Sequence, residues 1–258
     1  MRITKLGFIG TGFITEAVIT GLAKLADKVP EVWVSPRNAA VAARLAERYA
    51  FVHVASDNQD VLDRCDVVCL AVLPQHAGDI LPALAFRPAH HVLSFIAATN
   101  IARLAELVPG AAKRVRIVPL PMVANLNGPT AIYPADDIAQ ELFAALGQAV
   151  SVKDEVAFDA VCAATALMAG FYANLETYAQ WMAGKGVAYD DARSYLAVFF
   201  RGLGDIACAS NQGFAELAQD VSTEGGLNEQ VAKDLLAAGL PEISGRAIER
   251  VFQRIRGA

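Results

Sequence analysis

The chain has 258 residues, enough for two domains, with a formal net charge of −5 and a pI of about 5.4. The net charge is acidic and no basic patch stands out, which argues against nucleic acid as a partner. No apolar run reaches the ~18 residues of a membrane span. Hydrophobic residues make up 55% of the chain, so we expect no membrane partner but a partner subunit that covers apolar surface.

Strand-like and helix-like segments alternate in the first part of the chain. Residues 3–10 form a short apolar run that ends in glycine, and residues 13–26 follow with helical spacing. The same order continues with strand-like runs at 31–35, 51–54, 66–72, 90–97 and 114–120, a further candidate strand at 128–134, and helical patterns at 39–49 and 137–147. This alternation predicts an α/β fold with a Rossmann-type parallel sheet, which we assign to residues 1–152.

The pattern changes near Val156, where long helical segments follow one another with few turn signals. We therefore predict an all-helical domain over residues 153–258. Residues 158–175 are apolar on nearly all sides, so a helix there has to be buried on several sides. The remaining helices offer little cover, which predicts a homodimer through the C-terminal helices.

Cysteines and histidines show neither a disulfide framework nor a metal site. The four cysteines form no CxxC pair, and the adjacent His90 and His91 have no Cys or Asp companions at ligand spacing. Cys65 and Cys69 fall in or beside an apolar run, where we expect core residues. The N-terminus enters an apolar strand without a signal-peptide pattern, so we expect no metal and a reducing, cytoplasmic location.

The strongest chemical signal is the segment GFIGTGFITEAVITGL at residues 7–22. Gly10 permits a tight turn after the first strand, and Gly12 allows a pyrophosphate to approach the free N–H groups of the next helix. Thr15 stands in place of the third glycine of the dinucleotide fingerprint. An ordinary strand-to-helix turn would also contain such glycines, so the position at the start of a βαβ unit carries the prediction of a dinucleotide site.

The second strand-like run, VWVSPRN, selects the dinucleotide. A site that prefers NAD usually has an acidic residue here for the ribose 2′-hydroxyl, whereas this chain has Ser35, Arg37 and Asn38. A guanidinium and a hydroxyl suit a 2′-phosphate, which predicts NADP as the cofactor. The alternative is that Arg37 only caps the start of a solvated helix.

These segments, with AVLPQ, SFIAAT and the glycine pair of EGGLN, resemble the pyrroline-5-carboxylate reductase family over essentially the whole chain. The resemblance implies an NADPH-dependent reductase with a helical dimerisation domain. It also implies cofactor contacts from Gly10, Thr11, Gly12, Phe13, Ile14, Ser35, Arg37, Ala71, Leu73, Pro74 and Ala97. The loops that carry these residues follow strands, so they would lie at the carboxyl edge of the sheet, where ligands of such folds bind.

The substrate half departs from the family pattern. The family's asparagine after the sixth strand falls on Leu120, the proline that follows falls on Met122, and its small-residue stretch falls on the bulkier residues 164–172. Its GGTT motif falls on residues 225–228, where the threonine expected at the substrate nitrogen is Leu227. These differences imply that the substrate is not necessarily pyrroline-5-carboxylate.

For the substrate site we predict Asn228 as the catalytic group, because it is the polar group that remains in this motif. The predicted substrate contacts are Gly225, Gly226, Leu227, Met122 and Tyr172. A plain helix C-cap needs only one glycine, so the pair at 225–226 favours a ligand site. Other candidates for a proton donor are Glu229, Ser222, Thr223, Asn174 and His76, each of which could equally serve a local cap or core contact.

Two functions follow from this pattern. The first is NADPH-dependent reduction of a small cyclic imine, whose nitrogen arrives already protonated and so has less need of a protein acid. The alternative is a catalytically idle NADP(H)-binding sensor or scaffold, which would explain an altered substrate half.

Overall fold

The computed structural model describes residues 2–25 and 29–257, so the last residue of the helical pattern expected at 13–26 lies outside the described residues. The chain forms two compact units, one of Met1–Cys162 with Arg254–Ala258 and one of Ala163–Gln253. The predicted fold class, a Rossmann-type sheet domain followed by a helical domain, is confirmed. The domain boundary predicted between residues 152 and 153 lies in the connection after the last strand and stays a prediction.

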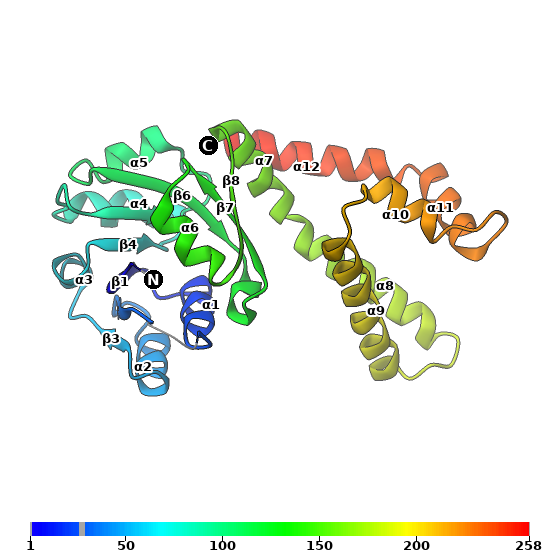
Figure 1. Cartoon of the computed structure of the whole chain (residues 1–258), viewed down its shortest axis with the longest axis horizontal. Helices are drawn as coiled ribbons and strands as arrows, with labels where there is room; N and C mark the ends of the chain where they lie inside the picture. Colours follow the sequence, from blue (N-terminus) through cyan, green and yellow to red (C-terminus); the bar gives the residue numbers. More distant parts are fainter. Residues whose placement is uncertain (1, 26–28, 258) are drawn as a thin grey trace. The chain divides into compact units, whose positions relative to one another are not determined.

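The described residues of the first unit form one sheet of eight strands, in the order β3-β2-β1-β4-β5-β6-β7-β8 (Figure 1). The strands are β1 (Lys5–Ile9), β2 (Glu31–Val34), β3 (Val52–Val54), β4 (Val67–Leu70), β5 (His91–Ser94), β6 (Lys113–Pro119), β7 (Gly128–Tyr133) and β8 (Gly147–Ser151). Neighbouring strands are parallel except β6 and β7, which run antiparallel. The candidate strand at 128–134 is therefore β7, whereas β8, a short strand with little buried surface, was not predicted from the sequence.

Helices cover both faces of this sheet. They are α1 (Phe13–Leu22), α2 (Ala39–Arg48), α3 (Asn58–Arg64), α4 (Pro74–Ile80), α5 (Ile101–Leu107) and α6 (Asp137–Ala144), with short 3-10 helices η1 (Leu81–Ala83) and η2 (Pro121–Asn125). Apolar side chains of α1, α2 and α6 pack with one face of the sheet, and those of α3, α4 and α5 pack with the other. Strand β1 serves both layers, since Leu6 and Phe8 point to the first and Ile9 to the second.

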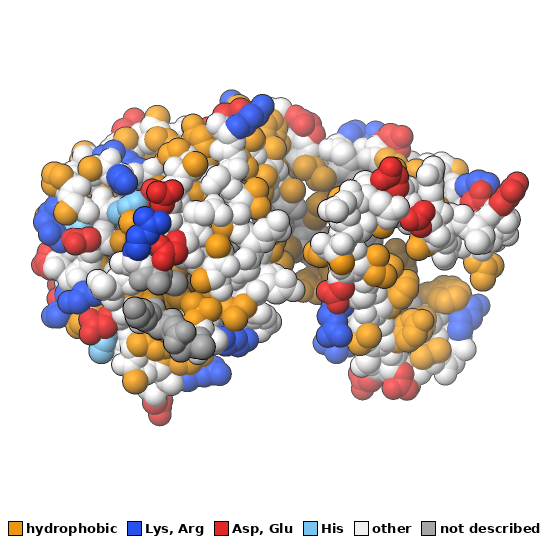
Figure 2. Space-filling model, viewed as in Figure 1, with side chains coloured by type: hydrophobic (Ala, Val, Ile, Leu, Met, Phe, Trp, Pro, Cys, Tyr) orange, Lys and Arg blue, Asp and Glu red, His pale blue; other side chains and the backbone are white. Residues whose placement is uncertain are grey.

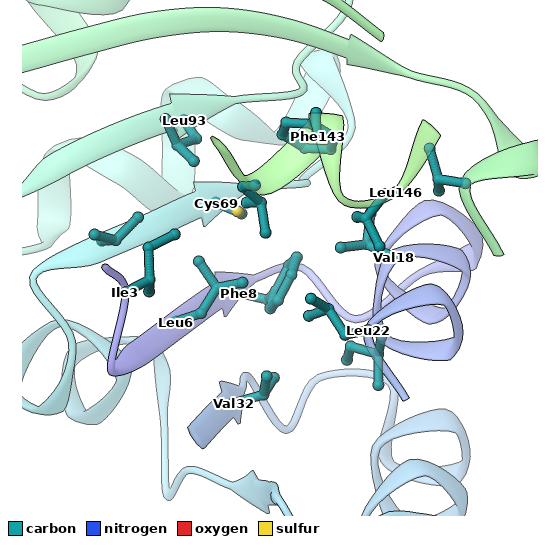
Figure 3. Close-up of a cluster of buried hydrophobic side chains, with 14 of the residues drawn as sticks. Ile3, Leu6, Phe8, Val18, Leu22, Val32, Cys69, Leu93, Phe143 and Leu146 are labelled. Carbon is teal, nitrogen blue, oxygen red and sulfur yellow. The ribbon is translucent and has the colours of Figure 1, made fainter. Parts of the chain in front are cut away.

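The layer beneath α1 and α6 is the larger core (Figure 3). Phe8 of β1 and Phe143 of α6 are completely buried in it, together with Val18 and Leu22 of α1. Each such side chain contributes roughly 1.5–3 kcal/mol by leaving water. Helix α1 also lies against η2 so closely that a Cβ on Gly21 would come 2.3 Å from the carbonyl oxygen of Val123.

A buried ion network joins β6 to the helices at the end of the first unit. Arg116 is buried, and its guanidinium lies 2.9 Å from Glu155 Oε1 and 2.9 Å from Asp159 Oδ1. Asp159 also pairs with Arg256 at 3.3 Å, and Glu155 accepts a hydrogen bond from the Ile101 N–H at 2.8 Å. Because a buried charge that loses its partner is costly, this network holds the start of α7 (Glu155–Thr165) and the end of α12 (Leu240–Arg256) to the sheet.

The second unit is helical, as predicted. It contains α8 (Leu167–Ala183), α9 (Tyr189–Ala209), α10 (Phe214–Asp220), α11 (Leu227–Ala237) and most of α12. Its buried core is small and centres on Ala179, Ala192 and Leu196 between α8 and α9. Large hydrophobic side chains such as Phe199 and Ile206 remain exposed on its helices, and Figure 2 shows hydrophobic side chains at this surface.

One helical stretch in the described part of the chain, Glu155–Ala183, is long and apolar enough to cross a membrane by length and composition. Its mean hydropathy is 1.6 and 17% of the relevant window is buried. The expectation that no apolar run reaches this length missed this stretch, because polar residues within it, such as Asp159 and Thr165, interrupt the run while its mean hydropathy stays high. Such a helix is weak evidence for a membrane, since the core helix of a soluble protein passes the same test.

Candidate functional site

The loop between β1 and α1 begins at a glycine that no other residue could replace without strain. Gly10 has a φ of +106°, in the region that favours glycine. A Cβ at this position would also lie 2.4 Å from the carbonyl oxygen of Ala71 and 2.8 Å from the amide nitrogen of Val72. The loop after β1 therefore lies directly against the loop after β4.

Ser35, directly after β2, fixes the conformation of this loop. Its hydroxyl accepts a hydrogen bond from the Gly10 N–H at 2.9 Å, and its carbonyl oxygen accepts one from the Thr11 hydroxyl at 2.6 Å. Thr15, in the place of the third fingerprint glycine, donates to the Gly10 carbonyl at 2.7 Å. The Ser35 side chain is buried in these contacts, so they give it a role in holding the loop, and direct contact with a phosphate stays a prediction.

Gly12 is a glycine for a different reason. A Cβ there would meet nothing within 4 Å, and its φ of −107° is open to any residue. It is the N-cap of α1, and no side chain caps the helix among the described residues. The N–H groups of the first turn are therefore free to bind an anion, and the bare Gly12 leaves room for a pyrophosphate at the helix dipole. This arrangement fits a dinucleotide.

A cleft of about 340 Å³ lies at this point. It is lined by Gly10, Thr11, Gly12, Ser35, Arg37, Asn38, Asn58, Ala71, Val72, Leu73, His76 and Ile80. The strand order reverses between β1 and β4, and ligands of open α/β sheets bind at such a reversal, outside the carboxyl ends of the strands. The structure thus brings together seven of the predicted cofactor residues, while Phe13, Ile14, Pro74 and Ala97 are not in the lining.

The end of the cleft near β2 is rich in hydrogen-bond donors. An adjoining hollow of about 430 Å³ is lined by Pro36, Arg37, Asp57, Asn58, His76, Asp79 and Ile80. Arg37 is exposed, and we find no hydrogen bond or ion pair to it among the residues described. Asn38, and not Arg37, is the N-cap of α2. The guanidinium is therefore available for a phosphate, as the predicted 2′-phosphate contact requires.

Asn58 was not predicted from the sequence, and His76 was not assigned to this end of the cleft. Asn58 opens α3, whose N-cap Asp57 accepts a hydrogen bond from the Asp60 N–H at 2.8 Å. The signal was the polar run SDNQ directly after the third strand, since a loop there lies at the same carboxyl edge as the Gly10 loop. His76 lies beside Arg37 in both hollows, so its position favours a cofactor contact over the role of proton donor.

The glycine pair of the second unit has local explanations. Gly225 has a φ of +69° and its N–H donates to Glu229 Oε2 at 2.9 Å. Gly226 is the N-cap of α11, and a Cβ there would lie 2.3 Å from Thr223 Oγ1. The turn itself requires both glycines, so the inference from the pair to a ligand loses its support. The assignment of both glycines to a substrate site stays a prediction.

The other predicted substrate residues of the second unit differ in their surroundings. The Asn228 amide donates to the Val221 carbonyl at 2.8 Å, which ties α11 to the end of α10. Hydrogen bonds from Lys233 and then from the Gly225 N–H lower the pKa of Glu229, which keeps it a carboxylate and not an acid. Leu227 and Tyr172 are exposed. Their roles, like that of Met122 after β6, stay predictions.

His90, His91 and Cys65 have structural positions. Within residues 2–25 and 29–257, no group of three or more His, Cys, Asp or Glu side chains could hold a metal ion. His90 accepts from the Arg87 N–H at 2.9 Å, and burial lowers its pKa. His91 lies 3.0 Å from Asp136 at the start of α6. Cys65 is in the core, as expected, and burial raises the pKa of its thiol to about 12.

Two family models match the chain, one for each half. The model described as NADP oxidoreductase coenzyme F420-dependent matches residues 5–100, and the model described as pyrroline-5-carboxylate reductase dimerisation matches residues 155–258. Relatives named pyrroline-5-carboxylate reductase match across both halves. One from Pseudomonas aeruginosa is 25% identical and covers 98% of this chain and 96% of its own.

Together these matches over both halves support the pyrroline-5-carboxylate reductase family. This confirms the resemblance predicted from the sequence and the class of NADP-dependent oxidoreductase. A pyrroline-5-carboxylate reductase from Glycine max is 28% identical, with 86% of this chain and 84% of that protein covered.

Solved structures agree in fold. A pyrroline-5-carboxylate reductase from Streptococcus pyogenes is 23% identical with a TM-score of 0.84, and covers 98% of both chains. One from Plasmodium falciparum with NADP bound is 18% identical with a TM-score of 0.81, and covers 99% of this chain and 98% of that one. A reductive aminase from Aspergillus terreus in complex with NADPH has a TM-score of 0.60 at 17% identity, with 100% and 94% covered. At these identities the likeness shows the fold alone.

Gly10 is required by the backbone and Gly12 leaves room for a ligand, so alanine at the two positions should impair different properties. Gly12→Ala should leave the melting temperature within about 2 °C of wild type, because its Cβ enters open space, yet weaken NADPH binding by about tenfold or more. Gly10→Ala should lower the melting temperature, because it combines a positive φ with backbone contact. Differential scanning fluorimetry and cofactor titration measure both. Unchanged NADPH affinity in a stable Gly12→Ala protein would contradict the assignment.

Arg37 should determine the choice between the cofactors. Losing a charge-assisted phosphate contact costs about 1.5–3 kcal/mol, so Arg37→Ala should weaken NADPH roughly tenfold to a hundredfold and leave NADH unchanged. Arg103→Ala is the matched control, because Arg103 pairs with Glu106 on α5, outside the cleft. Isothermal titration with both cofactors gives the values. Equal affinity of wild type for NADPH and NADH would rule out the phosphate role.

Proposed function

We propose that this protein is an NADPH-dependent reductase of a small cyclic imine. The observation that carries the proposal is the bare N-terminus of α1 at Gly12 beside an available Arg37, in a chain whose matches support the pyrroline-5-carboxylate reductase family. When bound, NADPH supplies a hydride.

Each part of the cleft has a task in holding that cofactor. The loop from Gly10 to Gly12 accommodates the pyrophosphate, and Ser35 keeps the loop in place. Arg37 would bind the 2′-phosphate through paired hydrogen bonds, with Asn38 and Asn58 as neutral donors beside it. These contacts fix the adenine end of the dinucleotide and direct its other end across the β1–β4 reversal.

The chemistry needs little from acidic side chains. The residues that connect β1, β4, β5 and β6 to the helices after them, 10–12, 71–73, 95–100 and 120, contain no carboxyl group, and the exposed Met122 follows β6. A protonated imine brings its own proton, so reduction of C=N suits this site better than reduction of a ketone, which needs a proton at oxygen. Asn228 remains the proposed polar contact from the helical unit.

The alternative of an idle NADP(H)-binding sensor or scaffold gains no support from the comparisons. The curated relatives that match nearly the full length of the chain are named as reductases. The altered positions Leu120, Leu227 and Asn228 instead concern which acceptor is reduced.

We also propose that the helical unit forms a homodimer. The dimerisation model matches residues 155–258, and exposed hydrophobic side chains extend over α8, α9 and α11. A reducing, cytoplasmic location remains the expectation for a chain with buried thiols at Cys65 and Cys69.

Turnover tests the enzymatic proposal. We expect steady oxidation of NADPH, followed at 340 nm, when a panel of five- and six-membered cyclic imines is added. Asn228→Ala should lower kcat by about tenfold while NADPH affinity is retained, if this amide touches the substrate. Lys153→Ala, an exposed position before α7, serves as control. Tight NADPH binding without turnover of any imine would instead support a sensor.

The dimer can be tested independently of turnover. Light scattering at micromolar concentration should give a mass of two chains or a multiple of two. Val198→Lys on α9 should weaken the assembly, because it places a charge on an exposed apolar face, whereas Val54→Lys on the edge strand β3 should not. A wild-type mass of 27.3 kDa would exclude the dimer.

A further inference from the structure

One carboxylate joins the buried ion network to the loop that follows β5. Glu155 Oε1 lies 2.9 Å from the guanidinium of Arg116, and the same oxygen accepts a hydrogen bond from the Ile101 N–H at 2.8 Å. Ile101 is the first residue of α5, directly after the loop of residues 95–100. A side chain from the first turn of α7 therefore fixes the point at which this loop enters its helix.

The loop after β5 has a conformation that needs support from outside. Ala98 has a φ of +51°, in the left-handed region that favours glycine, and a residue held there persists only where its surroundings fix it. The side-chain contacts within the loop are local. The Thr99 hydroxyl donates to the Ala97 carbonyl at 3.2 Å, and Asn100 caps α5. Glu155 supplies a contact from another element on the side that leads into the helix.

Arg116 holds this carboxylate in place. The arginine is 3% exposed, and its guanidinium lies over the ring of Phe158, 4.4 Å from the centroid. Its other terminal nitrogen lies 2.9 Å from Asp159, which pairs in turn with Arg256. A small polar cavity of about 90 Å³ lies here, and its lining includes Ala98 and Asn100 of the loop beside both carboxylates. The loop thus borders the network that orients Glu155.

The order of the strands places this loop at the nicotinamide end of the cofactor. Strand β5 lies beside β4, on the side away from β1 and β2. Arg37, after β2, is the proposed contact of the 2′-phosphate, and a dinucleotide crosses the β1–β4 reversal with its two halves on opposite sides. The carboxyl end of β5 is therefore on the side of the nicotinamide half. Ala97, in the same loop, is a cofactor contact that the family resemblance implies.

We infer that Glu155 is a positioning residue for the nicotinamide half of NADPH. Through the Ile101 N–H it holds the loop after β5 in the conformation that receives the nicotinamide, without touching the cofactor itself. This role rests on the proposed function and deepens it. Loss of the carboxylate should therefore impair the nicotinamide end of the site and leave the adenine end intact.

Two ligands separate the two ends. NADPH has both halves, whereas adenosine 2′,5′-bisphosphate has the adenine half with its 2′-phosphate and no nicotinamide. In the full-length protein, Glu155→Ala should weaken NADPH by about fivefold to tenfold, as expected for one lost hydrogen bond, and change the affinity for the bisphosphate by less than about twofold. Glu155→Gln should restore most of the NADPH affinity, because its amide oxygen can still accept the Ile101 N–H.

Asp159→Asn is the matched control. Asp159 lies at the same distance from Arg116, but no hydrogen bond joins it to the loop among the residues that the structure describes. This variant should lower the melting temperature and leave both affinities unchanged. Hydrogen exchange gives a readout without ligand, since the Ile101 amide should exchange about tenfold faster in Glu155→Ala and not in Asp159→Asn. Glu155→Asp, which shortens the side chain by one methylene, provides the same test if the alanine variant does not fold.

The outcomes distinguish this role from the proposed function. Equal weakening of both ligands in Glu155→Ala, unchanged NADPH affinity, or unchanged exchange at Ile101 would overturn the positioning role and leave the reductase intact. A selective loss of NADPH affinity in a protein that turns over no imine would support the positioning role and overturn the reductase. A wild-type protein that binds neither ligand would overturn both.

Discussion

The contact on which the site depends is the approach of two backbone segments at the ends of β1 and β4. The Gly10 loop touches Ala71 and Val72 where any side chain on Gly10 would overlap a carbonyl group. This contact forces the chain through a positive φ, and the Ser35 hydroxyl holds it there by accepting the Gly10 N–H. Helix α1 can then begin directly after Gly12 with its first N–H groups uncapped. The anion site therefore results from the close contact between the backbones of the loops after β1 and β4.

Much of this architecture could be predicted from the sequence because its strands are buried on both faces. Runs such as DVVCLAV leave few alternatives to a parallel sheet, and glycines after the first strand then indicate the cofactor loop. Strand β8 escaped prediction because it has little buried surface and so no distinct hydrophobic pattern. The part played by Ser35 also could not be predicted, because its hydrogen bonds join segments 25 residues apart.

The glycine pair at 225 and 226 shows a limit of arguments from residue type. Glycine was expected at a ligand, yet one member provides a left-handed turn and the other makes room for the Thr223 side chain. Both needs arise within a few residues of the pair, and the sequence alone does not distinguish them from close approach by a ligand. In contrast, Gly12 has no neighbour that excludes a side chain, which is why the structure strengthens the case for a ligand there.

The ion network around Arg116 has a consequence for the order in which the protein is made. Arg116, Asp159 and Arg256 all belong to the first unit, but Arg256 lies 97 residues after Asp159 in the chain, beyond the whole second unit. On the ribosome the sheet and its helices emerge long before that arginine. Until that arginine is made, Asp159 has Arg116 as its partner and lacks the second cation, so the segment that follows the helical unit completes an ion network begun within the sheet.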